Sequence, residues 1–263
     1  MINPPMHKRK NPKLPSRKRP PKRTKSVGTY WIFGVHAVSA AMMNPDRRID
    51  RLLVTEQAVP SLPEAPKADV VRRETVERKT IDSALPPDVV HQGVAACVHP
   101  LPALSVGDLE IADDALVVVL DQAQDPRNIG AVLRSAAAFS VAAVVVPDRG
   151  SPESGGALAK AAAGTLEKVP ILRETNLVRA LTSLKDMGFW CIGLDGAGQT
   201  AISEIDMSGK TALVLGGEGR GLRRLTRENC DVLARIPMAS GVESLNLSNA
   251  AAIALYEARR KSR

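Results

Sequence analysis

Apolar residues in the second half of the chain gather in short unbroken runs separated by helical segments. Unbroken runs indicate strands buried on both faces, and helices between such strands are typical of a parallel sheet covered on each side. From residue 115 onward, the runs that predict strands are 115–121, 141–147, 168–174, 189–195, 211–217 and 233–238. The segments that predict helices are 128–139, 154–164, 175–188 and 249–260. We therefore expect an α/β domain at residues 115–263, with ligands bound outside the carboxyl ends of its strands.

A smaller unit with the same mixture of elements precedes this domain. Residues 30–43 predict a short strand that runs into a helix, and residues 48–55 predict a second strand. A proline-rich loop follows, and residues 91–106 carry another short apolar strand. We therefore predict a small α/β domain at residues 28–100, joined to the larger one by a linker at 101–114.

The first residues of the chain differ from the rest in composition. The 263 residues carry a formal net charge of +8, yet residues 1–26 hold ten of the 36 basic residues, six prolines and no acidic residue. The remaining 26 basic and 28 acidic residues leave the rest of the chain near −2. Because few large apolar side chains offset the entropy of ordering, we predict a disordered basic arm at 1–27. We favour contact with RNA phosphates for this arm over a solubility tail or a targeting peptide.

Composition also excludes several classes of protein. The longest apolar runs are far shorter than the roughly 20 residues that cross a bilayer, and no apolar segment near the N-terminus resembles a signal peptide. Cys97, Cys191 and Cys230 and the four scattered histidines have no metal-ligand spacing. We therefore expect a cytoplasmic protein with no membrane contact and no structural metal.

The loop after the first strand of the large domain reads DPRNIGAVLRSAAAF from Asp125. Asp125 and Pro126 favour a turn, and Asn128 is expected to cap the helix that follows. Arg134 lies six residues beyond Asn128, within an otherwise small and apolar segment. A solvated arginine is the plain interpretation of this position, but a charge among apolar residues favours an anionic partner, such as a substrate group.

Four glycines stand within six residues, from Gly216 to Gly221, directly after the strand at 211–217, and they allow backbone to approach a ligand closely. A dinucleotide-binding fingerprint fails because its last glycine is absent, and the only GKT, at 209–211, precedes the strand instead of following it. A tight turn would explain one or two of these glycines, but not four together with Glu218. That acid could bind a ribose hydroxyl or accept a proton.

The last loop, IPMASGVESLNLSNAAAIALYEARR from Ile236, passes from a strand to an amphipathic helix. Glu243, Ser244, Asn246 and Ser248 precede that helix, and a helix cap requires only one of them. We expect the remaining polar groups to form a wall for a bound ligand.

These three loops closely resemble, in order, the three motifs of the SpoU/TrmH family of S-adenosylmethionine-dependent RNA ribose 2′-O-methyltransferases. The segments that carry the resemblance are DPRNIGAVLRSAAAF, LVLGGEGRGL and IPMASGVESLNLSNAAAIALYEA. IFGVHAV and HQGVAACV also resemble the small substrate-binding domain of the RlmB-like subgroup, which modifies large-subunit ribosomal RNA. The resemblance covers residues 28 to 260 and implies an enzyme that methylates a ribose 2′-hydroxyl.

The resemblance implies more about the fold than the periodicity does. It implies an L30e-like small domain and a C-terminal SPOUT domain with a deep trefoil knot, a rare exception to the rule against knots. It also implies S-adenosylmethionine as the cofactor, in a fully buried pocket without a metal, and a homodimer formed through the C-terminal domain. The apolar stripe of the last helix is equally consistent with packing on its own domain.

The functional positions of the family carry over to individual residues of this sequence. Those implied to contact S-adenosylmethionine are Gly216, Gly217, Ile236, Met238 and Leu245. Those implied to form the catalytic site are Asn128, Arg134, Glu218, Ser244 and Asn246. Because a guanidinium group keeps its proton, we interpret Arg134 as a phosphate clamp, and Glu218, or a water that it orients, as the proton acceptor.

Three functions stay open from the sequence. The first is 2′-O-methylation of a guanosine in large-subunit (23S) ribosomal RNA, the second is the same reaction on transfer RNA, and the third is a non-catalytic RNA-binding or ribosome-assembly module. The small domain argues against many transfer-RNA enzymes of the family, which lack it, and the complete set of site residues argues against the third. Aromatic residues make up only 3% of the chain, so backbone and arginine contacts are expected to dominate RNA recognition.

Overall fold

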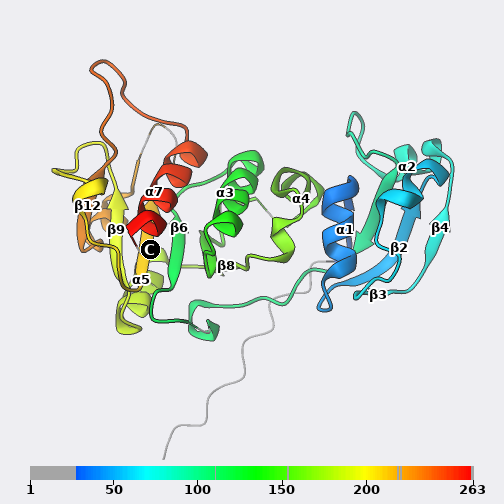
Figure 1. Cartoon of the computed structure of the whole chain (residues 1–263), viewed down its shortest axis with the longest axis horizontal. Helices are drawn as coiled ribbons and strands as arrows, with labels where there is room; N and C mark the ends of the chain where they lie inside the picture. Colours follow the sequence, from blue (N-terminus) through cyan, green and yellow to red (C-terminus); the bar gives the residue numbers. More distant parts are fainter. Residues whose placement is uncertain (1–27, 110, 153, 218, 220, 262–263) are drawn as a thin grey trace, which may run out of the picture.

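The computed structural model of the protein describes residues 28–109, 111–152, 154–217, 219 and 221–261. Two α/β domains lie side by side, with the small domain coloured blue to cyan (Figure 1). The predicted basic arm, residues 1–27, lies outside the described residues. Within the described part of the chain, no helix combines the length and the apolar character needed to cross a membrane.

The small domain is a mixed sheet with two helices. Its elements in chain order are β1 (Tyr30–Phe33), α1 (Val35–Met43), β2 (Arg48–Val54), the 3-10 helix η1 (Glu56–Ser61), β3 (Asp69–Val70), β4 (Arg73–Thr75), α2 (Arg78–Ala84) and β5 (Val94–Val98). The strand order is β1-β5-β2-β3, with β4 also paired to β2. The predicted first helix and the strands at β1, β2 and β5 are confirmed. The sequence did not predict β3, β4 and α2, which are short and polar; α2 buries only Ile81.

The large domain alternates strands and helices as its apolar pattern predicts. Its elements are η2 (Val106–Asp108), β6 (Leu116–Leu120), α3 (Pro126–Ala138), β7 (Ala143–Pro147), α4 (Gly156–Ala162), η3 (Thr165–Glu167), β8 (Ile171–Glu174), α5 (Leu177–Asp186), β9 (Trp190–Leu194), β10 (Thr200–Ala201), η4 (Ile202–Glu204), β11 (Thr211–Leu215), α6 (Arg224–Glu228), β12 (Val232–Arg235) and α7 (Leu247–Lys261). Each predicted strand and helix of this domain is confirmed. The two short elements β10 and α6 were not predicted.

The seven strands of the large domain form one parallel sheet in the order β10-β12-β9-β11-β6-β7-β8. Alternate residues of each strand face opposite layers: Val118 packs in the cluster that contains α3 and α7, whereas Val117 and Val119 pack in the cluster that contains α5. Both faces of the sheet are therefore covered, which explains the unbroken apolar runs. Because the strands are parallel, all their carboxyl ends lie at one edge. The knot implied by the resemblance stays a prediction.

The last helix, α7, packs on α3 of its own domain (Figure 1). Its residues buried in that contact region and in the core beneath it are Leu247, Ala251, Ala254, Leu255 and Ala258. Tyr256 is 55% exposed and sets its ring edge-on to Phe139, with ring centroids 6.4 Å apart. The apolar stripe of α7 is therefore satisfied largely within its own domain, while Ile253 and Tyr256 face outward.

Candidate functional site

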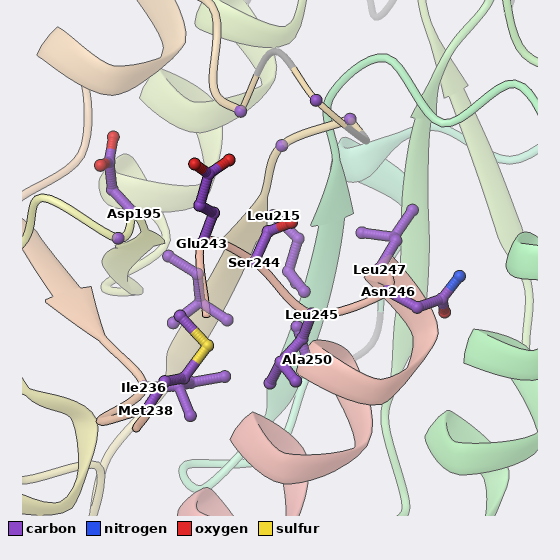
Figure 2. Close-up of a pocket in the computed structure, with 16 residues that line it drawn as sticks. Asp195, Leu215, Ile236, Met238, Glu243, Ser244, Leu245, Asn246, Leu247 and Ala250 are labelled. Atoms are coloured by element: carbon purple, nitrogen blue, oxygen red, sulfur yellow. The ribbon is translucent and has the colours of Figure 1, made fainter. Parts of the chain in front are cut away.

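A pocket of about 500 Å³ opens at the carboxyl ends of β9, β11 and β12, where the parallel sheet predicts a ligand (Figure 2). Its volume lies in the range of about 300–1,000 Å³ that is typical of small-molecule sites. Ile236 and Met238 line the lower part of the pocket in this view, and the carboxylates of Asp195 and Glu243 lie in its upper part (Figure 2). The expectation of a fully buried pocket is wrong for the single chain, because Glu243 and Ser244 are exposed and Met238 is 37% exposed.

The structure brings most of the predicted site residues together. The five residues predicted to contact the cofactor all line the pocket: Gly216, Gly217, Ile236, Met238 and Leu245. Of the predicted catalytic residues, Ser244 and Asn246 also line it. Asn128 joins them across 118 positions of sequence, because the Asn246 side-chain Nδ2 donates to the Asn128 Oδ1 at 3.1 Å. Arg134 is not among the lining residues, and Glu218 lies outside the described residues.

Asn246 also organises the start of α7. Its Oδ1 accepts hydrogen bonds from the Ser248 backbone N–H at 2.9 Å and from the Ser248 Oγ at 2.6 Å, as a helix N-cap does. Glu243 and Ser244 are left to line the pocket together with Asn246. The predicted polar wall is therefore present, but Ser248 serves the helix and not the wall.

The start of α3 differs from its predicted form. Asp125 is the N-cap, because its Oδ1 accepts the Arg127 backbone N–H at 2.8 Å, and Pro126 occupies the first turn. The prediction that Asn128 caps this helix is wrong. Asn128 lies within the first turn, and its amide bonds to Asn246.

Arg134 occupies the solvent-facing side of α3. The residues that this helix buries are Ile129, Gly130, Val132, Leu133 and Ala136. Arg134 is exposed, and within the described part of the chain no hydrogen bond or ion pair involves its guanidinium group. The plain interpretation of a solvated arginine fits this position, because the residues that α3 buries lie on its other side. The exposed position leaves a cation that an RNA phosphate can reach.

The glycine segment after β11 is a tight turn that closes on itself. The Gly221 N–H donates to the Gly217 carbonyl at 3.0 Å, and Gly219 and Gly221 have φ angles of +77° and +63°. A Cβ at Gly217 would lie 2.8 Å from the Gln122 carbonyl oxygen, and one at Gly216 would overlap the Gly221 backbone. Positive φ angles account for Gly219 and Gly221, and close approach of other backbone accounts for Gly216 and Gly217.

A buried carboxylate that the sequence interpretation missed anchors this turn. The Asp121 side chain is fully buried at the end of β6 and accepts the Arg223 backbone N–H at 3.0 Å and the Arg223 Nε at 2.5 Å. The Asp121 backbone N–H donates to the Leu215 carbonyl at 2.7 Å. Asp121 thus ties the end of β6 to both ends of the glycine turn. The sequence does carry a signal for this role, because Asp121 is an acidic residue directly after an apolar run that predicts a strand.

Replacing Asp121 tests how firmly this turn is held. Asp121→Asn removes the charge and one acceptor while a guanidinium partner stays beside the buried amide, so we expect a loss of about 1–3 kcal/mol in the free energy of unfolding. Urea denaturation measures this loss. The matched control is Glu228→Gln, which breaks the exposed Arg224 pair at 2.7 Å and should cost at most about 0.5 kcal/mol. Equal effects of the two variants would contradict the anchoring role.

Asp195 is a second functional candidate that the sequence interpretation missed. It directly follows β9 and lines the pocket, with its Oδ1 accepting the Ala197 N–H at 2.9 Å and its Oδ2 lying 3.4 Å from the Arg227 Nε. Asp195 and Glu243 both bring a carboxylate to the lining of the pocket. Among the residues that the structure describes, no three His, Cys, Asp or Glu side chains are grouped to hold a metal ion.

Two cysteines near β9 and β12 are poor candidates for covalent chemistry. Burial raises the pKa of Cys191 and of Cys230 to about 12 in each case, and nearby negative charge adds to both shifts. Thiols with such pKa values stay protonated at neutral pH, and the thiolate is the nucleophilic form. The chemistry of the site therefore rests on its amides, hydroxyl and charged groups.

Two family models match the chain, one on each domain. The model described as the SpoU rRNA methylase family matches residues 115–256, and the model described as RNA 2′-O ribose methyltransferase substrate binding matches residues 31–104. The first match covers more than half of the chain. Both matches agree with the arrangement of a small domain followed by a parallel α/β domain.

Individual relatives cover nearly the whole chain. The 23S rRNA (guanosine-2′-O-)-methyltransferase RlmB of Xylella fastidiosa is 41% identical over 239 residues, which span 88% of this chain and 96% of that protein. The protein of the same name from Vibrio vulnificus is 40% identical over 89% of this chain and 98% of its own length. The SpoU methyltransferase AviRb from Streptomyces viridochromogenes, solved with AdoMet, shares the fold, with a TM-score of 0.75 at 23% identity over 89% of this chain and 90% of that one. The chain therefore belongs to the SpoU rRNA methylase family.

Proposed function

We propose that this protein transfers a methyl group from S-adenosylmethionine to the 2′-hydroxyl of a guanosine in large-subunit (23S) ribosomal RNA. The observation that carries the proposal is the pocket at the ends of β9, β11 and β12, whose wall reaches Asn128 through Asn246. Two curated relatives that span nearly all of the chain bear the name of this activity. Both family matches support an RNA substrate.

The pocket fits S-adenosylmethionine in size and chemistry. Ile236, Met238 and Leu245 supply apolar contact area, and the glycine turn after β11 brings backbone polar groups to the pocket without side chains in the way. Asp195 and Glu243 complement a ligand that carries positive charge. When bound, S-adenosylmethionine supplies a methyl group on a positively charged sulfur, which departs as a neutral thioether.

The remaining side chains suit the needs of the ribose. A ribose hydroxyl is a weak nucleophile at neutral pH, so it must be oriented and relieved of its proton. The hydrogen-bonded amides of Asn128 and Asn246 lie at the edge of the pocket, where they can orient this hydroxyl. Arg134 carries an exposed guanidinium group, so it can hold the RNA phosphate and the charge that develops on the ribose oxygen.

We assign proton acceptance to Glu218, or to a water that it orients, because a guanidinium group is an unsuitable base and a carboxylate is a suitable one. Glu218 itself lies outside the described residues. The wild-type rate should rise with pH as the carboxylate loses its proton and then level off. Glu218→Gln is expected to slow single-turnover methylation and to remove this rise. An unchanged rate and pH profile in Glu218→Gln would remove Glu218 from the role, with Glu228→Gln on α6 as the control.

The whole proposal is tested by incubating the purified protein with radiolabelled S-adenosylmethionine and unmodified total RNA. The RNA is then separated by size, and the labelled band is digested to nucleosides. Label recovered from large-subunit RNA as 2′-O-methylguanosine is the expected result. Label in transfer RNA would move the substrate to that class, and no label despite measured binding of S-adenosylmethionine would favour a non-catalytic RNA-binding module or a need for an assembly intermediate.

We also propose that two copies of the chain form a homodimer through α7 and the neighbouring loop. The supporting observation is that Ile253 and Tyr256 on α7, and Met238 and Val242 in the loop before it, are apolar residues exposed in the single chain. Wild-type protein should sediment as a dimer, and Tyr256→Glu should shift it to a monomer with unchanged circular dichroism. Trp190→Glu, which alters an exposed aromatic residue at the start of β9, should stay dimeric. A folded Tyr256→Glu variant that remains a dimer would contradict this interface.

Four further assignments extend the proposal. We divide the chain into an arm (1–27), an L30e-like domain (28–100), a linker (101–114) and a methyltransferase domain (115–263); the supporting elements are β5, which ends at Val98, and β6, which begins at Leu116. We propose a trefoil knot near α7, which tracing the chain in a crystal structure would test. We propose a cytoplasmic location, which cell fractionation would test.

We also propose that the basic arm, residues 1–27, contacts RNA phosphates. Deleting the arm should therefore weaken RNA binding, and the loss should be largest at low salt.

A further inference from the structure

The small domain and the large domain meet in a close contact between β1 and α1 on one side and α4 and η3 on the other (Figure 1). A Cβ added at Gly156 would lie 2.7 Å from the Trp31 carbonyl oxygen, and one at Gly164 would lie 2.9 Å from the His36 carbonyl oxygen. The backbones approach too closely at both places for any larger residue. The two domains are therefore docked directly as well as joined through the linker.

A buried ion pair lies within this contact. The Arg47 Nη2 is 2.7 Å from the Glu167 Oε1, and the Arg47 Nε donates to the Glu167 Oε2 at 3.1 Å. The Arg47 side chain is fully buried and that of Glu167 is 5% exposed. Arg47 belongs to the small domain and Glu167 ends η3 of the large domain. This bidentate pair fixes both the distance between the two domains and their relative orientation.

The small domain supplies the remaining partners of the pair. The Arg47 Nη1 donates to the His99 carbonyl at 2.6 Å and to the Tyr30 hydroxyl at 3.3 Å, and the Asn44 Nδ2 donates to the Glu167 Oε2 at 2.8 Å. Burial by itself lowers the pKa of Arg47, but the hydrogen bonds and negative charge of Glu167 raise it above its ordinary value. The Glu167 carboxylate of the large domain is therefore bound by two side chains of the small domain, those of Arg47 and Asn44.

The contact continues from α4 to the helix that carries two site residues. A Cβ at Gly130 of α3 would lie 2.8 Å from the Ala161 carbonyl carbon of α4, so these helices also touch backbone to backbone. Asn128 and Arg134 stand on α3 on either side of Gly130. The small domain is therefore linked to the site through only one intervening helix.

We propose that Arg47 and Glu167 are positioning residues that hold the RNA-binding small domain in one orientation on α4, so that bound RNA presents a single ribose to the site on α3. The inference rests on the proposed function for its RNA substrate. A buried pair favours the one arrangement that satisfies both charges and opposes arrangements that leave either charge buried alone. Neither residue touches the reacting atoms.

The test compares Glu167→Gln with Glu74→Gln. Glu74 pairs with Arg51 at 2.9 Å and with Arg72 at 3.2 Å, both exposed arginines of the small domain, so its loss removes arginine–carboxylate pairs without touching the domain contact. For Glu167→Gln we expect KM for large-subunit ribosomal RNA to rise about tenfold, with kcat and the Kd for S-adenosylmethionine within about threefold of wild type. The radius of gyration from small-angle X-ray scattering should increase. Glu74→Gln should match wild type in all four quantities.

Several outcomes would overturn the inference. Wild-type values of KM and radius of gyration in folded Glu167→Gln would do so, and so would a loss of kcat and thermal stability with KM unchanged, which marks a merely structural role. If Glu167→Gln does not fold, Arg47→Lys is tested in its place. Lysine keeps the positive charge but cannot form the bidentate hydrogen bonds of arginine. An unchanged KM and an unchanged radius of gyration in Arg47→Lys would again overturn the inference. The two tests can fail separately. Wild-type protein that fails to methylate ribosomal RNA would count against the proposed function. Scattering needs no RNA, so it would still decide whether the Arg47–Glu167 pair holds the domains together.

Discussion

Gly216→Ala is expected to weaken binding of S-adenosylmethionine by about 100-fold or more, because the added methyl group has no room. A Cβ at this position would overlap the backbone of Gly221 and Leu222, neither of which can swing aside as a side chain would. The glycine turn would have to move away from the end of β11, and it lines the pocket. Isothermal titration calorimetry of the purified variant measures the loss.

The control for this experiment lies at the other end of the same strand. Gly209 has nothing within 4 Å of an added Cβ, so Gly209→Ala should bind S-adenosylmethionine as wild type does. Circular dichroism checks that both variants are folded. Wild-type affinity in a folded Gly216→Ala variant would show that the donor does not depend on this turn.

Arg134→Ala is expected to slow single-turnover methylation by about 100- to 1,000-fold while leaving the Kd for S-adenosylmethionine unchanged. Arg134 is exposed and does not line the pocket, so its removal should alter neither the donor site nor the free energy of unfolding by more than about 0.5 kcal/mol. What it removes is a cation that can hold RNA phosphate and stabilise charge on the ribose oxygen. Rapid quenching with excess enzyme isolates this step from product release.

Arg179→Ala is the matched control for the arginine experiment. Arg179 is an exposed arginine on α5, the helix that covers the opposite face of the sheet from α3. Its loss lowers the net charge by the same amount without affecting the site. A similar fall in rate for both variants would indicate that overall positive charge, and not the position of Arg134, assists the reaction.

The large domain was predictable because its strands are buried on both faces. A run such as Leu116–Leu120 is fully buried in the structure, so selection for apolar residues leaves an unbroken signal. The unpredicted elements lack that signal: α6 buries only Thr226, and β10 has two residues. Short elements of this kind are stabilised by their surroundings more than by their own sequence.

The candidate site was only partly predictable. The cofactor-contact positions were implied by the family motifs that two loops resemble, and the parallel sheet brings these loops to one edge. The contact between Asn128 and Asn246 and the pair between Asp121 and Arg223 join residues 118 and 102 positions apart, and local pattern carries no information about either. The sequence left the direction of Arg134 open, because neighbouring residues on a helix face different directions.

These long-range contacts also affect when the donor site forms during folding. The pocket closes only when the segment after β12 returns to α3, so a chain that ends before Asn246 has the sheet but no complete donor site. Native contacts that span about 100 residues are slow to form, because a large loop must be closed before they contribute stability. Competence for the donor should therefore be gained late in folding, after most secondary structure has formed, and an incompletely synthesised chain would not consume S-adenosylmethionine.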